Sequence, residues 1–104
     1  MSSCTLEKKH DGYEIGGLIN FDTVSCLYHQ PTFLIEAGQE IKLDFAKVTH
    51  ADSSAIALLL SWLRIAKEKG ASIVLENLPA QLLEIANVCE VKPFLEHHMR
   101  HDHG

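Results

Sequence analysis

The sequence has few cysteines and no excess of basic residues. Its 104 residues include three cysteines, Cys4, Cys26 and Cys89, with no CxxC pair among them. An odd and scattered set of this kind favours reduced thiols in a cytosol over a disulfide framework. Acidic residues outnumber basic ones by 14 to 9, which gives a net charge of −5. This balance argues against a nucleic-acid groove or a polybasic membrane patch, because both need clustered Lys and Arg.

Long apolar runs and glycine-rich loops are also missing. The longest uninterrupted apolar run covers residues 55–60, far short of the roughly 20 residues that span a bilayer. The opening residues, MSSCTLEKKHDG, contain no apolar signal-peptide segment, and no Gly-rich phosphate-binding motif is present. We therefore expect a cytoplasmic protein that reaches a membrane only through partner subunits.

Strand-like and helix-like hydrophobic patterns alternate along the chain. Strands are predicted over residues 4–10, 13–19, 40–48 and 72–76. Helices are predicted over residues 23–37 and 53–69, and two more elements are predicted to begin at Pro79 and at Pro93. An Asp11-Gly12 turn indicates an antiparallel hairpin, and the nearly all-apolar run 72–76 is typical of a central, buried strand. Alternating strands and helices predict parallel pairs with right-handed crossovers. The expected fold is one α/β domain, residues 1–96, with a mixed sheet of four or five strands and about four helices, followed by a His-rich tail, residues 97–104.

An aspartate and two serines, Asp52, Ser53 and Ser54, stand between the strand at residues 40–48 and the most hydrophobic helix. Helix starts favour such residues because a side-chain oxygen satisfies a free N–H group of the first turn. One cap needs only Asp52 or Ser53, so one hydroxyl is left over.

The spare hydroxyl is a candidate phosphoacceptor. A phosphate would add about two negative charges, and the helix dipole and the free N–H groups would tolerate them. Phosphorylation would then leave the helix folded and place charge beside Asp52 on a surface that binds a partner. On the residues alone, capping and switching both remain open.

The segment LDFAKVTHADSSAIALLLSWLRIAKEKGASIVLENLP, residues 43–79, resembles the centre of a STAS domain, the family of the anti-sigma-factor antagonists. Members typically show a strand ending in LDLS, then DSSG, an apolar helix, a glycine and another strand. The segments GYEIGGLINFDTV and LPAQLLEIANVCEV are similar as well, so the resemblance covers nearly the whole chain except the tail. Two residues depart from the pattern: Ala55 replaces the usual glycine, and Asn20 stands where many members have an acidic residue.

Within the family, this segment most resembles the MlaB-type members, small cytoplasmic subunits of the Mla ABC transporter that moves phospholipids between the membranes of Gram-negative bacteria. The resemblance implies a non-enzymatic accessory subunit, without a cofactor, docked on an MlaF-like ATPase subunit at the inner membrane. It would support the phospholipid transport that maintains outer-membrane lipid asymmetry. The alternative is an anti-sigma-factor antagonist that binds a serine kinase. In antagonists the phosphorylated serine corresponds to Ser54, and in MlaB-type members the notable hydroxyl corresponds to Ser53.

The helix over residues 53–69 has an apolar arc wider than one sheet face needs. At about 100° per residue, one face forms an ordinary core stripe, made of Ile56, Leu59, Leu60, Leu63 and Ala66. A second stripe beside it consists of Leu58, Trp62 and Ile65. Either a neighbouring helix covers this second stripe or the stripe binds a partner, since Trp is favoured at the centre of interfaces.

The end of the chain is rich in histidine, with His97, His98, His101 and His103. The spacing of His97 and His101 fits a helical metal pair, but no complete ligand set is present and a solvated tail is expected. A triad of Ser53, His50 and Asp52 is too local to align a nucleophile, a base and an orienting group. The sequence therefore predicts no metal site and no catalytic residue.

Overall fold

Strands and helices alternate along the chain, as the hydrophobic pattern predicts. The computed structural model describes residues 4–28 and 36–99. The strands are β1 (Cys4–Lys9), β2 (Gly12–Ile19), β3 (Glu40–Ala51) and β4 (Ser72–Glu76). The helices are α1 (Ser25–Tyr28), α2 (Ser53–Lys69), α3 (Ala80–Val88) and α4 (Lys92–His98).

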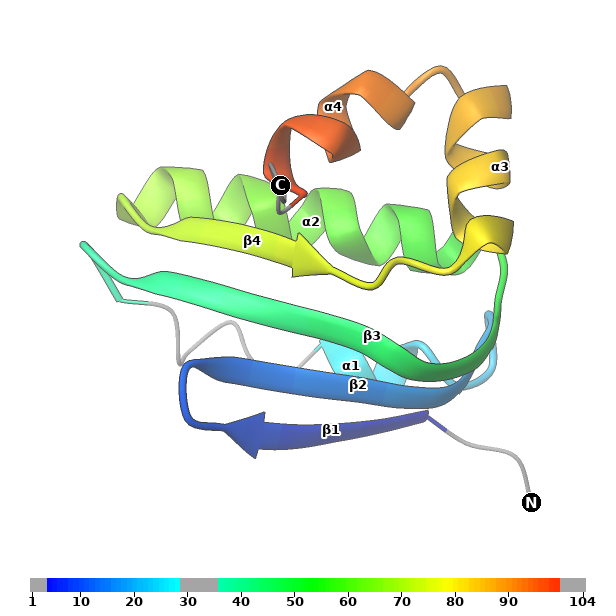
Figure 1. Cartoon of the computed structure of the whole chain (residues 1–104), viewed down its shortest axis with the longest axis horizontal. Helices are drawn as coiled ribbons and strands as arrows, with labels where there is room; N and C mark the ends of the chain where they lie inside the picture. Colours follow the sequence, from blue (N-terminus) through cyan, green and yellow to red (C-terminus); the bar gives the residue numbers. More distant parts are fainter. Residues whose placement is uncertain (1–3, 29–35, 100–104) are drawn as a thin grey trace, which may run out of the picture.

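The four strands form one mixed sheet in the order β1-β2-β3-β4 (Figure 1). The hairpin pair β1 and β2 is antiparallel, whereas β2 with β3 and β3 with β4 are parallel. A parallel neighbour requires a crossover connection, and α2 supplies the one between β3 and β4. The predicted mixed sheet is confirmed, with four strands among the described residues.

The hairpin turn lies one residue earlier than the Asp11-Gly12 pair predicts. Lys9 pairs with Gly12, so His10 and Asp11 form the turn. Gly12 already belongs to β2, where an added Cβ atom would clash with the Lys42 carbonyl oxygen. The glycine is therefore needed for the close approach of β2 to β3, and the turn itself falls on its neighbours.

The core lies on one face of the sheet, because side chains alternate between the two faces of a strand. In β3 the buried side chains are those of Ile41, Leu43 and Phe45, and in β4 they are those of Ile73 and Leu75. The helix α2 lies across this face (Figure 1). The opposite face is half-buried and largely polar along β2 and β3.

β4 is an edge strand, which corrects the expectation of a central position. Its apolar composition has another cause. Ile73 and Leu75 face the core, and the chain after α4 covers part of the outer edge, where Met99 forms a parallel bridge with Leu75. Because α4 and the residue that follows it pack along β4, this edge strand has apolar surroundings like those of a central strand.

The helix predicted over residues 23–37 is different in the structure. Residues 21–24 form turns, α1 spans Ser25–Tyr28, and Ala37 lies in a turn before Gly38. The predicted kink at Pro31 lies outside the described residues. At the other end of the chain, His97 and His98 belong to α4, while the tail residues 100–104 lie outside the described residues.

Candidate functional site

Asp52 is the N-cap of α2, which decides between the two capping residues that the sequence allows. Its backbone is extended, with φ −119° and ψ −165°, as is usual for a residue that precedes a helix. Its Oδ1 atom accepts a hydrogen bond from the Ser54 backbone N–H at 2.8 Å. The carboxylate therefore satisfies one of the free N–H groups of the first turn.

The two adjacent serines have opposite environments. The Ser54 side chain is buried, with 3% of its surface exposed, and its hydroxyl donates a 2.5 Å hydrogen bond to Asp52 Oδ1. Ser53 is exposed at the first position of α2. The spare hydroxyl that the sequence predicts is thus Ser53, because the Ser54 hydroxyl is part of the cap.

We expect Asp52→Ala to lower the free energy of unfolding by about 1–2 kcal/mol. The substitution removes the acceptor of the Ser54 backbone N–H and leaves the buried Ser54 hydroxyl without its partner. Urea titration of the variant measures the loss. Asp22→Ala is the matched control, since Asp22 is exposed and a change there should stay within about 0.5 kcal/mol. Equal losses in both variants would contradict the cap.

A tightly bonded turn lies beside this helix start. Asn20 Oδ1 accepts hydrogen bonds from the backbone N–H groups of Asp22 at 2.9 Å and Thr23 at 3.0 Å. Thr23 Oγ1 donates to the Leu18 carbonyl at 2.7 Å and accepts from the Asn20 N–H at 2.9 Å. These bonds fix the backbone on both sides of Phe21, whose side chain is 72% exposed.

Strand pairing brings the turn and the helix start together. Ile19 pairs with Ala51, and the Asp52 N–H donates to the Ile19 carbonyl at 3.2 Å. Phe21 follows β2 by two residues, and Ser53 follows β3 by two residues. Both therefore lie where two parallel strands end, the edge at which open α/β sheets place their binding sites.

The start of α3 reaches the same edge. Gln81 Oε1 accepts a hydrogen bond from the Ala51 backbone N–H at 3.1 Å, and Gln81 Nε2 lies 3.4 Å from His50 Nδ1. We call the exposed set Phe21, His50, Ser53 and Gln81 the carboxyl-edge surface. It combines one large exposed aromatic side chain with polar groups on three separate elements.

Leu58 and Trp62 are in the core, so the second apolar stripe is covered by neighbouring elements, and this corrects the alternative in which these residues bind a partner. Each is 1% exposed, and Ile65 is half-buried against the same cluster. The physical reason is that α2 is covered on several sides: it contacts β4 and α3, and Val24 and Leu27 from the α1 region join the same core. A wide apolar arc is what such a central helix needs.

The side chains around His50 and Asp52 have other hydrogen-bond partners than the ones a triad requires. In the triad considered from the sequence, Ser53, His50 and Asp52, the Asp52 carboxylate accepts hydrogen bonds from Ser54, and His50 Nδ1 lies 3.4 Å from Gln81 Nε2. Within residues 4–28 and 36–99, no group of three or more His, Cys, Asp or Glu side chains is placed to hold a metal ion. Among the helices of the same residues, none is long and apolar enough to cross a membrane.

Comparison with known proteins identifies the family. A family model described as "Mlab, STAS domain" matches residues 5–96. The chain belongs to the MlaB-type STAS family. The predicted STAS fold is therefore confirmed, and the Asp52-Ser53-Ser54 cap lies within the matched region. The chain is also similar to the anti-sigma-B factor antagonist of Bacillus subtilis (strain 168), with 23% identity over 82 aligned residues. The aligned region covers 79% of this chain and 75% of that protein.

Phe21 is the functional candidate that the sequence reasoning missed. A signal for it exists: a single aromatic side chain stands between Asn20 and Asp22, two residues typical of turns. An aromatic residue in a polar turn has no strand or helix face to bury it. Its exposure is therefore predictable, although its place at the same sheet edge as Ser53 depends on the register of β2 and β3.

Proposed function

We propose that this STAS domain is a non-enzymatic accessory subunit that binds the ATPase subunit of an Mla-type ABC transporter. It would be cytoplasmic, held at the inner membrane through its partner, and would support the phospholipid transport that maintains outer-membrane lipid asymmetry. STAS domains act through partner proteins, and the MlaB-type match supports this particular partner. Within the structure, the observation that carries the proposal is that Phe21 and Ser53 are both exposed just beyond the paired ends of two parallel strands.

The carboxyl-edge surface has properties that suit a docking site. Aromatic side chains dominate binding energy when they lie near the centre of an interface. The turn around Phe21 is held by side-chain and backbone hydrogen bonds, so little conformational freedom is lost when a partner covers it. Phe21 and Ser53 are also not part of the hydrophobic core, because both side chains are exposed.

We expect Phe21→Asp to weaken binding of the ATPase subunit by about 2 kcal/mol or more, roughly 30-fold. A charged side chain cannot be buried at an apolar contact without a partner. Calorimetric titration with the purified ATPase subunit measures the change. Val88→Asp is the matched control, because Val88 is 82% exposed and lies at the far end of α3.

The experiments test the identity of the partner and the location of the docking site separately. Stoichiometric co-purification of the wild-type chain with an ATPase subunit supports the partner. Equal affinities for the Phe21→Asp and Val88→Asp variants would move the docking site elsewhere on the domain. Recovery of a serine kinase from the native bacterium, with no transporter component, would contradict the transporter role.

A second candidate function is an anti-sigma-factor antagonist switched by phosphorylation, which the similarity to the Bacillus subtilis protein favours. The resemblance to antagonists points to Ser54 as the phosphorylated serine; we infer that the switch would act at Ser53 instead, and the burial of Ser54 and its bond to Asp52 support this. Mass spectrometry of the chain after incubation with a lysate of the native bacterium and ATP tests this. Phosphate on Ser53 would support the switch, and phosphate on Ser54 would contradict the assignment of the accessible hydroxyl. Neighbouring genes for a serine kinase, instead of an ATPase and a permease, would favour this second function.

A further inference from the structure

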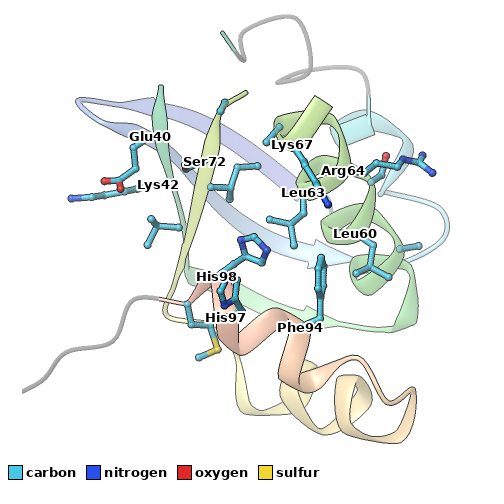
Figure 2. Close-up of a pocket in the computed structure, with 17 residues that line it drawn as sticks. Glu40, Lys42, Leu60, Leu63, Arg64, Lys67, Ser72, Phe94, His97 and His98 are labelled. Carbon is cyan, nitrogen blue, oxygen red and sulfur yellow. The ribbon is translucent and has the colours of Figure 1, made fainter. Parts of the chain in front are cut away.

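A large groove lies on the domain away from the carboxyl-edge surface. It runs between the middle and C-terminal part of α2, the first half of β4 and the helix α4, with a volume of about 1470 Å³ (Figure 2). From α2 it is lined by Leu60, Leu63 and Lys67, and from α4 by Phe94 and His98. Ser53 and Phe21 are not part of it.

The groove has an apolar interior that remains open to solvent. Phe94 is 48% exposed, and Figure 2 shows its ring pointing into the space between α4 and α2. Leu60 is half-buried, Leu63 is buried, and both line the same space from α2. Concave sites with mainly apolar walls and a few polar groups are the usual form of small-molecule sites.

The charge of the groove is opposite to that of the chain. Its lining includes three basic side chains, Lys42, Arg64 and Lys67, and one acidic side chain, Glu40, in a chain with a net charge of −5. Figure 2 shows Lys67 pointing toward Phe94 and His98, while Glu40 and Lys42 lie on the far side of the sheet strands. In the described part of the chain, Lys67 has no ion-pair partner. A lysine in the last turn also complements the helix dipole, but that role does not require it to point into an apolar groove.

His98 forms part of the groove lining next to Phe94. Partial burial, and to a smaller extent the neighbouring His97, lower the pKa of His98 below its usual value, although a hydrogen bond from its ring to the Ile73 backbone opposes this. The His98 ring packs edge-on against Phe94, with centroids 5.1 Å apart. Of the basic side chains on α2 that line the groove, Lys67 points toward Phe94 and His98, whereas Arg64 points away from them (Figure 2).

The outer edge of β4 is not free to accept a peptide strand at this point. Met99 forms a parallel bridge with Leu75, and α4 contacts β4. Addition of a strand needs a row of unpaired backbone groups, so an extended peptide is disfavoured. An apolar wall with one inward-pointing cation favours a ligand with an apolar chain and an anionic head.

We propose that the groove binds a single-chain lipid with an anionic head group. The hydrocarbon chain lies against Leu60, Leu63 and Phe94, and the carboxylate or phosphate head lies against the Lys67 ammonium group. The chain buries the exposed part of Phe94 on binding, and the head supplies the ion-pair partner that Lys67 lacks among the described residues.

Calorimetric titration of the full chain with dodecanoate and with dodecyl phosphate, both below their micelle concentrations, tests the proposal. Both should bind, whereas neutral dodecyl maltoside and inorganic phosphate should bind at least about tenfold more weakly, because each lacks one half of the recognised chemistry. Equal binding of dodecyl maltoside would overturn the role of the charge. Equal binding of inorganic phosphate would overturn the role of the chain.

Two pairs of variants locate the site. Lys67→Glu should weaken binding at least about tenfold, whereas Lys8→Glu, the same charge change at an exposed position of β1, should alter it less than about twofold. Phe94→Ser should weaken binding, and Val88→Ser, at an exposed apolar side chain outside the groove, should not. Thermal melts of all four verify folding. Equal effects within either pair would overturn the site.

Two further outcomes distinguish the lipid from other occupants. If a second copy of the chain fills the groove, the wild-type protein without lipid will show a concentration-dependent dimer that Phe94→Ser abolishes. If the groove binds the ATPase subunit, Lys67→Glu will weaken that complex while no lipid binds. Either result would overturn the lipid proposal, and neither depends on the Phe21 surface.

Discussion

Trp62→Ala should lower the free energy of unfolding by about 3–5 kcal/mol, the usual range for removing a buried aromatic side chain. Trp62 is 1% exposed and is the largest fully buried side chain in the core. Its removal from the middle of α2 leaves a cavity that the surrounding sheet and helices can fill only in part. Urea titration followed by circular dichroism measures the loss without relying on the fluorescence of the removed residue.

A conservative variant keeps this prediction testable if the alanine variant fails to fold. Trp62 Nε1 has no hydrogen-bond partner among the described residues, so Trp62→Phe removes volume without breaking a bond seen there. It should lose only about 1–2 kcal/mol. Glu68→Ala, at an exposed position of the same helix, should stay within about 0.5 kcal/mol. A loss below about 1 kcal/mol for Trp62→Ala would contradict the core assignment and restore Trp62 as a surface residue.

The case of Trp62 shows what hydrophobic periodicity can and cannot predict. Periodicity locates the helix at residues 53–69, and the structure has α2 at Ser53–Lys69. Periodicity also finds both apolar stripes, but it contains no information about which neighbours cover them. Covering depends on tertiary contacts with β4, α3 and the α1 region, which join residues distant in the sequence.

The residues that cap α2 are also predictable from the sequence, but their burial is not. The aspartate and serines mark the helix start correctly, and Gly70 ends the helix with a left-handed φ of 73°, as a C-terminal glycine should. The sequence does not show which serine is buried. Adjacent helical residues differ by about 100° in direction, so one of two neighbours can face the core while the other faces solvent. Only the packing of α2 against the sheet decides between Ser53 and Ser54.

The carboxyl-edge surface depends on register, which the sequence predicts poorly. The pairing of β2 with β3 contains two irregularities, between Glu14 and Gly16 and between Gly17 and Leu18. Each shift changes which residue of β2 stands opposite a given residue of β3. The proximity of the Phe21 turn to Ser53 follows from the final pairing of Ile19 with Ala51, which no local pattern specifies.

The same substitution at the two adjacent serines should have opposite effects on stability. Ser54→Asp should lower the free energy of unfolding by about 3 kcal/mol or more, because it places a second carboxylate in a buried position beside Asp52. Ser53→Asp should raise it by about 0.3–1 kcal/mol, since Ser53 is exposed at the first position of α2 and the helix dipole favours an anion there.

Neutral variants separate charge from size in this comparison. Ser54→Asn adds nearly the same volume as aspartate without the charge, so a much smaller loss for Ser54→Asn than for Ser54→Asp assigns the effect to the buried carboxylate. Ser53→Asn should leave the stability within about 0.5 kcal/mol of wild type. Denaturant titration of the four variants at neutral pH gives all the values. If Ser54→Asp proves as stable as Ser53→Asp, the Ser54 side chain must be accessible in solution, and a phosphate on Ser54 would then be compatible with the fold.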